Sequence, residues 1–177
     1  MKATIPIAAA GALLIAGGAA LGAGSTLINQ SSIAGKGTGL AQSAYRGAFG
    51  RAQVDRLEGG TVRLNFSSTT TEVYFPRAGG AKADAIVTGN QSYRTAAGIG
   101  PCSTYGELKA AYPSLARVPK WGGLLWRNGR LWFRVDDGAG PTSTPADTDV
   151  VRVVMLVPRK APALAGTYAG NSGVTCS

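Results

Sequence analysis

The side chains that could carry out chemistry in this sequence are limited by one absence, because the chain contains no histidine. Without histidine, the common Ser-His-Asp and Cys-His nucleophilic arrangements cannot form, and most catalytic zinc sites lose a ligand. No lysine has a serine three positions before it, so the Ser-x-x-Lys nucleophile motif is also missing. Gly98-Ile99-Gly100 lacks the last glycine of a dinucleotide-binding loop. We therefore expect no catalytic residue, no cofactor and a protein that is not an enzyme.

The carboxylates offer little more chemistry. Nine acidic residues are present, and most are scattered, so we predict no facing pair of the kind that a glycosidase needs. The loop 136–149 is the exception, since it holds Asp136, Asp137, Asp147 and Asp149. These side chains could bind calcium, but their spacing matches no EF-hand, and a solvated acidic loop is the alternative. We predict no metal site and leave calcium binding by this loop open.

The two cysteines, Cys102 and Cys176, are the remaining reactive side chains. In an oxidising compartment two cysteines of one chain usually form a disulfide. The alternative is that Cys102, just before a predicted helix, is a nucleophile activated by the helix dipole. That role needs a base, normally a histidine, so the disulfide is the prediction.

The segment Leu124–Val135, with the sequence LLWRNGRLWFRV, is typical of a β-hairpin that turns at Asn128-Gly129. Strand alternation then gives the hairpin a core face, consisting of Leu124, Trp126, Leu131, Phe133 and Val135. Its other face consists of Leu125, Arg127, Arg130, Trp132 and Arg134. One hypothesis is that this second set binds a partner, with Trp132 as an exposed anchor among arginines, as in interface hot spots. The other is that Trp132 packs under the helix or under the linker predicted over residues 25–60.

The clearest helix is predicted at Thr104–Tyr112. Thr104 and Glu107 have the spacing of a capping box, in which each side chain satisfies a backbone donor of the other residue. Apolar residues recur on one face of the segment, and Pro113 ends it. A helix of two to three turns is marginal alone in water, so we expect it to pack on a sheet.

The fold prediction is an α+β domain over residues 61–177, with an antiparallel sheet of about six strands. Besides the hairpin, the strands are predicted at Thr61–Ser67, Thr71–Phe75, Ala83–Thr88 and Val150–Val157. The last of these is mostly β-branched and apolar, as in a central strand covered on both faces. Residues 61–88 and 124–157 weakly echo each other as two three-stranded meanders.

Residues 25–60 contain many small residues and few bulky apolar ones. This composition predicts a flexible linker with a short helix at Ala52–Leu57, stopped by the glycines that follow.

Residues 1–24 are typical of a signal peptide, because Lys2 precedes a long uncharged stretch that ends in small residues. The alternative is an uncleaved membrane anchor, since about 20 apolar residues can span a bilayer. We predict a secreted or cell-envelope location.

The formal net charge of +9 falls by one if Lys2 leaves with the signal peptide. An exported basic protein meets anionic partners, although the spread of the arginines also fits a charge that only maintains solubility. The leading hypothesis is an exported, non-enzymatic binding protein for an acidic protein or an anionic envelope polymer, without specific nucleic-acid recognition. The alternative is a structural envelope component anchored by an uncleaved N-terminal segment.

The segment SYRTAAGIGPCSTYGELKAAYP, the Trp-rich hairpin, the Val-rich strand and the terminal GTYAGNSGVTCS together resemble a group of uncharacterised secreted actinobacterial proteins. The resemblance covers residues 93–177 and implies export and the pairing of Cys102 with Cys176, but no activity. More distantly, helix-then-meander units are similar to the β-lactamase-inhibitor-protein fold and to the small lipoprotein of the outer-membrane assembly machinery. Those proteins bind other proteins on a sheet face, although fold alone does not fix function.

Overall fold

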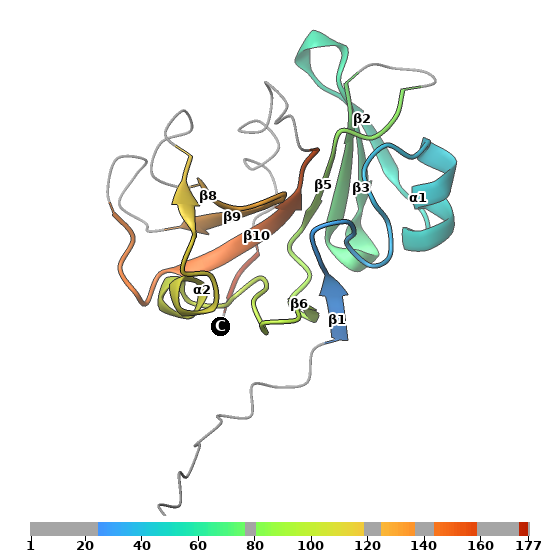
Figure 1. Cartoon of the computed structure of the whole chain (residues 1–177). Coiled ribbons are helices and arrows are strands. Elements are labelled where there is room, and N and C mark those ends of the chain that lie inside the picture. The colour runs from blue at the N-terminus through green and yellow to red at the C-terminus, as the bar shows by residue number, and fades with distance from the viewer. Residues whose placement is uncertain (1–24, 77–80, 119–124, 137–143, 159–173, 177) are drawn as a thin grey trace, which may run out of the picture.

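The computed structural model describes residues 25–76, 81–118, 125–136, 144–158 and 174–176, where an eight-stranded antiparallel sheet dominates (Figure 1). The strands lie in the order β2-β3-β4-β5-β10-β9-β8-β7. Their bounds are β2 Gln53–Arg56, β3 Val62–Phe66, β4 Thr71–Phe75, β5 Ala85–Thr88, β7 Ala116–Arg117, β8 Leu125–Asn128, β9 Leu131–Asp136 and β10 Val150–Leu156. A separate parallel pair joins β1 (Ser25–Ile28) to β6 (Tyr93–Thr95).

The six expected strands are all present in this sheet, and the two additional ones are its edges, β2 and β7. Both are short, and most of their side chains are exposed, so neither carries the apolar alternation that marks a buried strand. The expected helix at Ala52–Leu57 is wrong, because this segment forms β2 instead. The 3₁₀ turn Glu58–Gly60 folds β2 back onto β3, with Gly59 and Gly60 both at positive φ.

The order of elements repeats. Helix α1 (Gln42–Phe49) precedes β2–β5, and helix α2 (Tyr105–Ala111) precedes β7–β10. Because β5 pairs with β10, two antiparallel four-stranded units join at the middle of one sheet, and each helix lies near its own unit (Figure 1). The predicted echo between 61–88 and 124–157 therefore corresponds to a structural repeat, of four strands rather than three in each unit.

Helix α2 confirms the sequence prediction. The Thr104 hydroxyl accepts a hydrogen bond from the Glu107 N–H at 3.2 Å, and the Glu107 carboxylate accepts one from the Thr104 N–H at 2.8 Å. Tyr105 and Leu108 are buried against the sheet, as the short helix requires. The predicted capping box thus fixes where this helix begins.

The linker prediction for residues 25–60 is wrong over the part of that segment that forms β1, α1 and β2. Tyr45 and Phe49 are one turn apart on α1, and both rings are buried in the core. Tyr45 also donates a hydrogen bond to the Gly37 carbonyl at 2.6 Å, which ties the loop before α1 to the helix. Ile28 and Ile33 are buried in the same core, so four bulky side chains dock a segment made mostly of small residues, and the domain begins before residue 61.

The sheet has a core on each face. The helix face carries the larger core, to which α1, α2 and the loop after β1 contribute. The opposite face, called the second face below, carries a smaller core of Tyr74, Ala85, Val87, Leu125, Trp132, Val153, Met155 and Val157. Strand β10 supplies buried residues to both cores, as predicted for a central strand.

Residues 1–24, the predicted signal peptide, lie outside the described part of the chain. Among the residues that the structure describes, no helix is long and apolar enough to cross a membrane.

The hairpin forms, but its register differs from the predicted one. Asn128 pairs with Leu131 and Trp126 pairs with Phe133, so the turn residues are Gly129 and Arg130. The glutamine side chain of a distant loop holds this turn: Gln30 donates to the Asn128 carbonyl at 2.9 Å and accepts from the Arg130 N–H at 2.7 Å. Gly129 has a φ of 59°, which favours glycine, and a Cβ there would lie 2.6 Å from the Gln30 Oε1, so a larger residue would displace the glutamine side chain. The pairing moved by an even number of residues, so the predicted faces are preserved for the described residues; Leu124 lies outside them.

Candidate functional site

Two of the five predicted partner-binding residues are in the interior. Leu125 is 2% exposed and Trp132 is 3% exposed, and both belong to the core of the second face. The hypothesis of an exposed Trp132 is wrong, because the ring is buried. It packs in the core of the face opposite the helices, so the alternative of packing under the helix or the linker is correct about burial but wrong about the face. The reason is the position of β9 next to the central strand β10, where Trp132 lies opposite Met155. Neither side chain is available to a partner.

Of the three predicted arginines, only Arg127 is exposed. Arg130 is half-buried, where it donates to the Val157 carbonyl at 2.9 Å and to the Thr38 hydroxyl at 2.8 Å. These bonds join the hairpin turn to the end of β10 and to the loop before α1, so Arg130 has a structural role. Arg134 is half-buried on β9. The predicted set is thus mostly scaffold, with Arg127 as its accessible member.

The predicted disulfide between Cys102 and Cys176 is present, with a Cα–Cα distance of 5.5 Å. It joins the segment before α2 to the end of the chain. Nearby, Arg152 donates to the Val174 carbonyl at 2.7 Å and Gln91 donates to the Thr175 carbonyl at 2.9 Å. A disulfide is compatible with an extracytoplasmic location. It also removes Cys102 as a free nucleophile.

The acidic loop contacts α2 and β10. The carbonyls of Asp147 and Asp149 accept hydrogen bonds from the first backbone N–H groups of α2, at 3.0 and 2.7 Å. The Asp147 carboxylate pairs with Lys109 at 2.5 Å, and Asp136 pairs with Arg152 at 3.4 Å. Asp137 lies outside the described residues. Within the described part of the chain, no three potential metal-ligating side chains of His, Cys, Asp or Glu come together.

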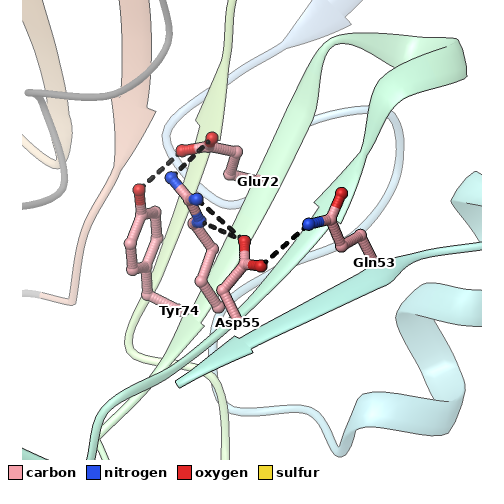
Figure 2. Close-up of polar contacts among 5 residues, drawn as sticks. Gln53, Asp55, Glu72 and Tyr74 are labelled. Carbon is pink, nitrogen blue, oxygen red and sulfur yellow. Dashed lines mark hydrogen bonds and ion pairs between the residues drawn. The ribbon is translucent and has the colours of Figure 1, made fainter. Parts of the chain in front are cut away.

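A polar cluster that the sequence did not predict lies at the other end of the second face (Figure 2). We call it the Arg63 cluster; it consists of Gln53, Asp55, Arg63, Glu72 and Tyr74. Arg63 makes two bonds to the Asp55 carboxylate, at 2.8 and 3.0 Å, and one to Glu72 at 3.2 Å. Tyr74 donates to the other Glu72 oxygen at 2.5 Å, and Gln53 donates to Asp55 at 3.1 Å. Three adjacent strands, β2, β3 and β4, are therefore joined by side chains as well as by backbone.

Strand pairing explains how these side chains meet. Asp55 lies directly opposite Arg63, and Arg63 lies directly opposite Tyr74. Opposed residues of antiparallel strands project to the same face with Cβ atoms about 5 Å apart, and diagonal neighbours are within reach of long side chains. Glu72 is such a diagonal neighbour of Arg63. Once β2 is recognised as a strand, the charges at 55, 63 and 72 are the signal that sequence analysis could have used.

The cluster is built to hold charge and offers no free acid or base. Burial lowers the pKa of the Arg63 guanidinium, but the Asp55 hydrogen bonds and the Glu72 charge outweigh it, so the net shift is upward. Burial, followed by the hydrogen bond and charge of Glu72, raises the pKa of the Tyr74 hydroxyl far above 10.0. Tyr74 therefore stays protonated and acts as a donor. With both carboxylates bonded on each oxygen, the arrangement favours a structural role over catalysis.

The remaining charges divide in an uneven way. Most described carboxylates are bonded within the chain: Asp55, Glu72, Asp136 and Asp147 in ion pairs, Glu107 in the capping box, and Asp149 with the Ala146 N–H. By contrast, several exposed cations have no ion pair among the described residues: Arg46, Arg51, Arg56, Lys82, Arg117 and Arg127. The surplus positive charge is therefore at the surface.

Comparison with known proteins adds no assignment: no family model matches the chain, and neither a curated protein nor a solved structure matches it.

Proposed function

We propose that this protein is an exported binding protein, without catalytic chemistry of its own, whose partner is an anionic polymer of the cell envelope. The observation that carries the proposal is the division of charge in the described residues. Most described acids are bonded inside the chain, whereas six exposed cations have no ion pair among the described residues. A surface of this kind attracts polyanions through a long-range field.

The positions of the cations favour an extended partner. Arg46, Arg51 and Arg56 lie on α1, before β2 and on β2, at one end of the sheet. Arg117 and Arg127 lie on β7 and β8, at the other end. The other strands separate the two groups, so a compact acidic patch on a partner protein would reach only one group. A long chain with repeated negative charges can contact both.

The proposal predicts that binding depends on both groups of arginines. The purified, oxidised protein would be titrated by calorimetry with a poly(glycerol phosphate) chain, a phosphate-rich envelope polymer, and with a short glutamate peptide. The double variants Arg51→Gln with Arg56→Gln, and Arg117→Gln with Arg127→Gln, should each weaken polymer binding. Each should also reduce its salt dependence, because the removed contacts are screened by salt.

A matched control separates this proposal from an effect of net charge. Lys36→Gln with Lys109→Gln removes two positive charges outside both groups; Lys36 is half-buried and Lys109 is already paired with Asp147. This control should bind the polymer nearly as well as the unchanged protein. Equal weakening in all three double variants, or no binding of the polymer at low salt, would rule the proposal out. A partner that contacts one group alone would indicate an acidic protein instead.

A further inference from the structure

Strand β2 is an edge of the eight-stranded sheet with backbone groups directed outward. The Leu57 N–H donates to the Thr61 carbonyl at 2.8 Å, so Leu57 and Thr61 form a hydrogen-bonded pair at the end of the β2–β3 ladder. In an antiparallel ladder the hydrogen-bonded pairs alternate, so Asp55 and Gln53 direct their backbone groups toward β3. The N–H and C=O groups of Val54 and Arg56 therefore point away from the sheet. Among the described residues, no backbone hydrogen bond to another segment satisfies them.

This edge has only part of the usual protection. Natural edge strands are protected by short length, charged side chains, proline or a bulge, which discourage pairing with another chain. Strand β2 is short and charged but has no proline and no bulge, and its Asp55 is already paired with Arg63. Val54 is 49% exposed, the more exposed of two large apolar residues found on the described surface. The opposite edge, β7, has only two residues and carries Arg117. The two edges of one sheet are therefore unequal as pairing surfaces.

We propose that a second copy of this chain pairs with β2 through its own β2, antiparallel, with the twofold axis at Val54. Outward-directed backbone groups occur at 52, 54 and 56, so hydrogen-bonded pairs across the interface must join these positions. When Val54 faces the partner's Val54, both exposed valines bury each other on the helix side of the sheet. The same register places Gln53 opposite the partner's Asp55, an amide donor opposite a carboxylate.

The charges at this edge select that register. Arg51 becomes a diagonal neighbour of the partner's Asp55, within reach of a long side chain, and the twofold axis makes this contact twice. A shift toward the C-terminus of β2 would place Asp55 opposite the partner's Asp55, and like charges directly opposite are destabilising. A further shift would place Arg56 opposite the partner's Arg56. Self-complementarity is thus confined to the N-terminal part of the strand.

The interface is short, so the dimer is expected to be weak and to dissociate on dilution. Sedimentation of the purified, oxidised protein up to millimolar concentration should show a reversible monomer–dimer equilibrium. Val54→Lys places two like charges face to face and should weaken the dimer by about tenfold or more. Leu40→Lys is the matched control, since Leu40 is the other exposed apolar residue, 39% exposed and outside β2. It should leave the equilibrium unchanged.

A cross-link tests the register directly. Facing residues of a hydrogen-bonded pair have Cα atoms about 5.5 Å apart, and a disulfide spans that distance. Val54→Cys should therefore give a covalent dimer on mild oxidation, with the Cys102–Cys176 disulfide verified by mass spectrometry, and Leu40→Cys should not. A protein that stays monomeric at every concentration overturns the proposal. The proposal is overturned in that case even if β2 binds an extended peptide of another protein. A dimer that is insensitive to Val54→Lys overturns it too. Because Arg51 and Arg56 lie at this interface, polyanion binding is measured at protein concentrations where the monomer predominates, so that failure of one proposal is distinguishable from failure of the other.

Discussion

The two halves of the sheet have the same order of elements but different means of stabilisation. In the half formed by α1 and β2–β5, the Arg63 cluster joins three strands through polar side chains. The N-cap residue of α1, Ala41, makes no capping hydrogen bond with its side chain. In the half formed by α2 and β7–β10, the second face holds the buried Trp132, and a capping box and a disulfide fix the start of the helix. The comparison shows that one topology can be held by ion pairs or by apolar packing and covalent chemistry.

This difference has an energetic consequence. A buried ion pair contributes little net stability when intact, because desolvation offsets the attraction, but removing one partner leaves an uncompensated charge. A buried tryptophan contributes stability in proportion to the apolar area that it removes from water. The first half should thus be sensitive to single charge changes, and the second to the loss of volume and of the disulfide.

The largest single effect is expected for Trp132→Ala. Truncating a core tryptophan removes its contacts and leaves a cavity, which costs about 3–5 kcal/mol. Urea denaturation with the disulfide intact measures the change. Arg127→Ala, at the exposed residue opposite Trp132, is the control and should change the free energy of unfolding by less than about 0.5 kcal/mol. A loss for Trp132→Ala as small as that of the control would contradict the packed assignment.

Loss of the disulfide should have a similar effect. The two cysteines are 74 positions apart, and closing a loop of that size stabilises a fold by roughly 4 kcal/mol in the chain-entropy model. The double variant Cys102→Ser with Cys176→Ser should be less stable by about that amount, and the reduced protein should behave in the same way. Intact-mass analysis checks the pairing itself. Alkylation of two thiols without prior reduction would refute it.

The Arg63 cluster gives the next largest effect. Arg63→Met leaves Glu72, whose side chain is 7% exposed, without its cation, and should cost about 3 kcal/mol. The estimate is at the lower end for buried pairs because the Arg63 side chain itself is 16% exposed. Arg56→Met, on the neighbouring strand and without an ion pair to any described residue, is the control and should be nearly neutral. Equal stability of the two variants would show that the cluster contributes nothing.

Alkaline pH should reveal the titration of Tyr45, one of two buried tyrosines in the first half. Burial raises the pKa of Tyr45 from 10.0 to about 12, against a smaller lowering by a backbone hydrogen bond. Because the pKa of Tyr45 is higher in the folded than in the unfolded state, the contribution of protonated Tyr45 to the free energy of unfolding is complete below pH 10. This contribution is lost as the pH rises toward 12. In this window Tyr45→Phe should reduce the slope of unfolding free energy against pH by about 1.4 kcal/mol per unit. Below pH 9 the slopes should agree; an unchanged slope above pH 10 would exclude the shift.

The smallest effects concern the two helix starts. Thr104→Ala removes a cap of α2 and should cost about 1 kcal/mol. The equivalent position of α1 is Ala41, whose side chain makes no capping bond, so Ala41→Ser should raise stability by up to about the same amount. Thermal melts of both variants and of the combined variant measure the asymmetry. No gain from Ala41→Ser would indicate that the loop before α1 already satisfies these donors.

The features that were predicted correctly depend on local patterns. The capping box of α2 needs only Thr104 and Glu107 at the right spacing, and the six inner strands follow from apolar alternation and β-branched residues. The disulfide was predicted from the presence of two cysteines and the expectation of an oxidising compartment. Each signal lies within a few residues or in a count over the whole chain, so no knowledge of distant contacts was needed.

The features that were missed depend on contacts between distant segments. Strand β2 has no apolar alternation and becomes a strand because β3 offers it a partner. Gln30, about a hundred positions earlier in the chain, holds the hairpin turn at Gly129-Arg130. The burial of Trp132 follows from the place of β9 beside β10.

The sequence by itself thus determined the inner strands, the start of α2, the disulfide and the absence of histidine chemistry. Only the tertiary structure decided which strands are edges, which arginines are exposed and which charges meet in the Arg63 cluster. The physical reason is that local propensity acts within one turn or one strand. Burial and ion pairing depend on where the other strands of the sheet are placed.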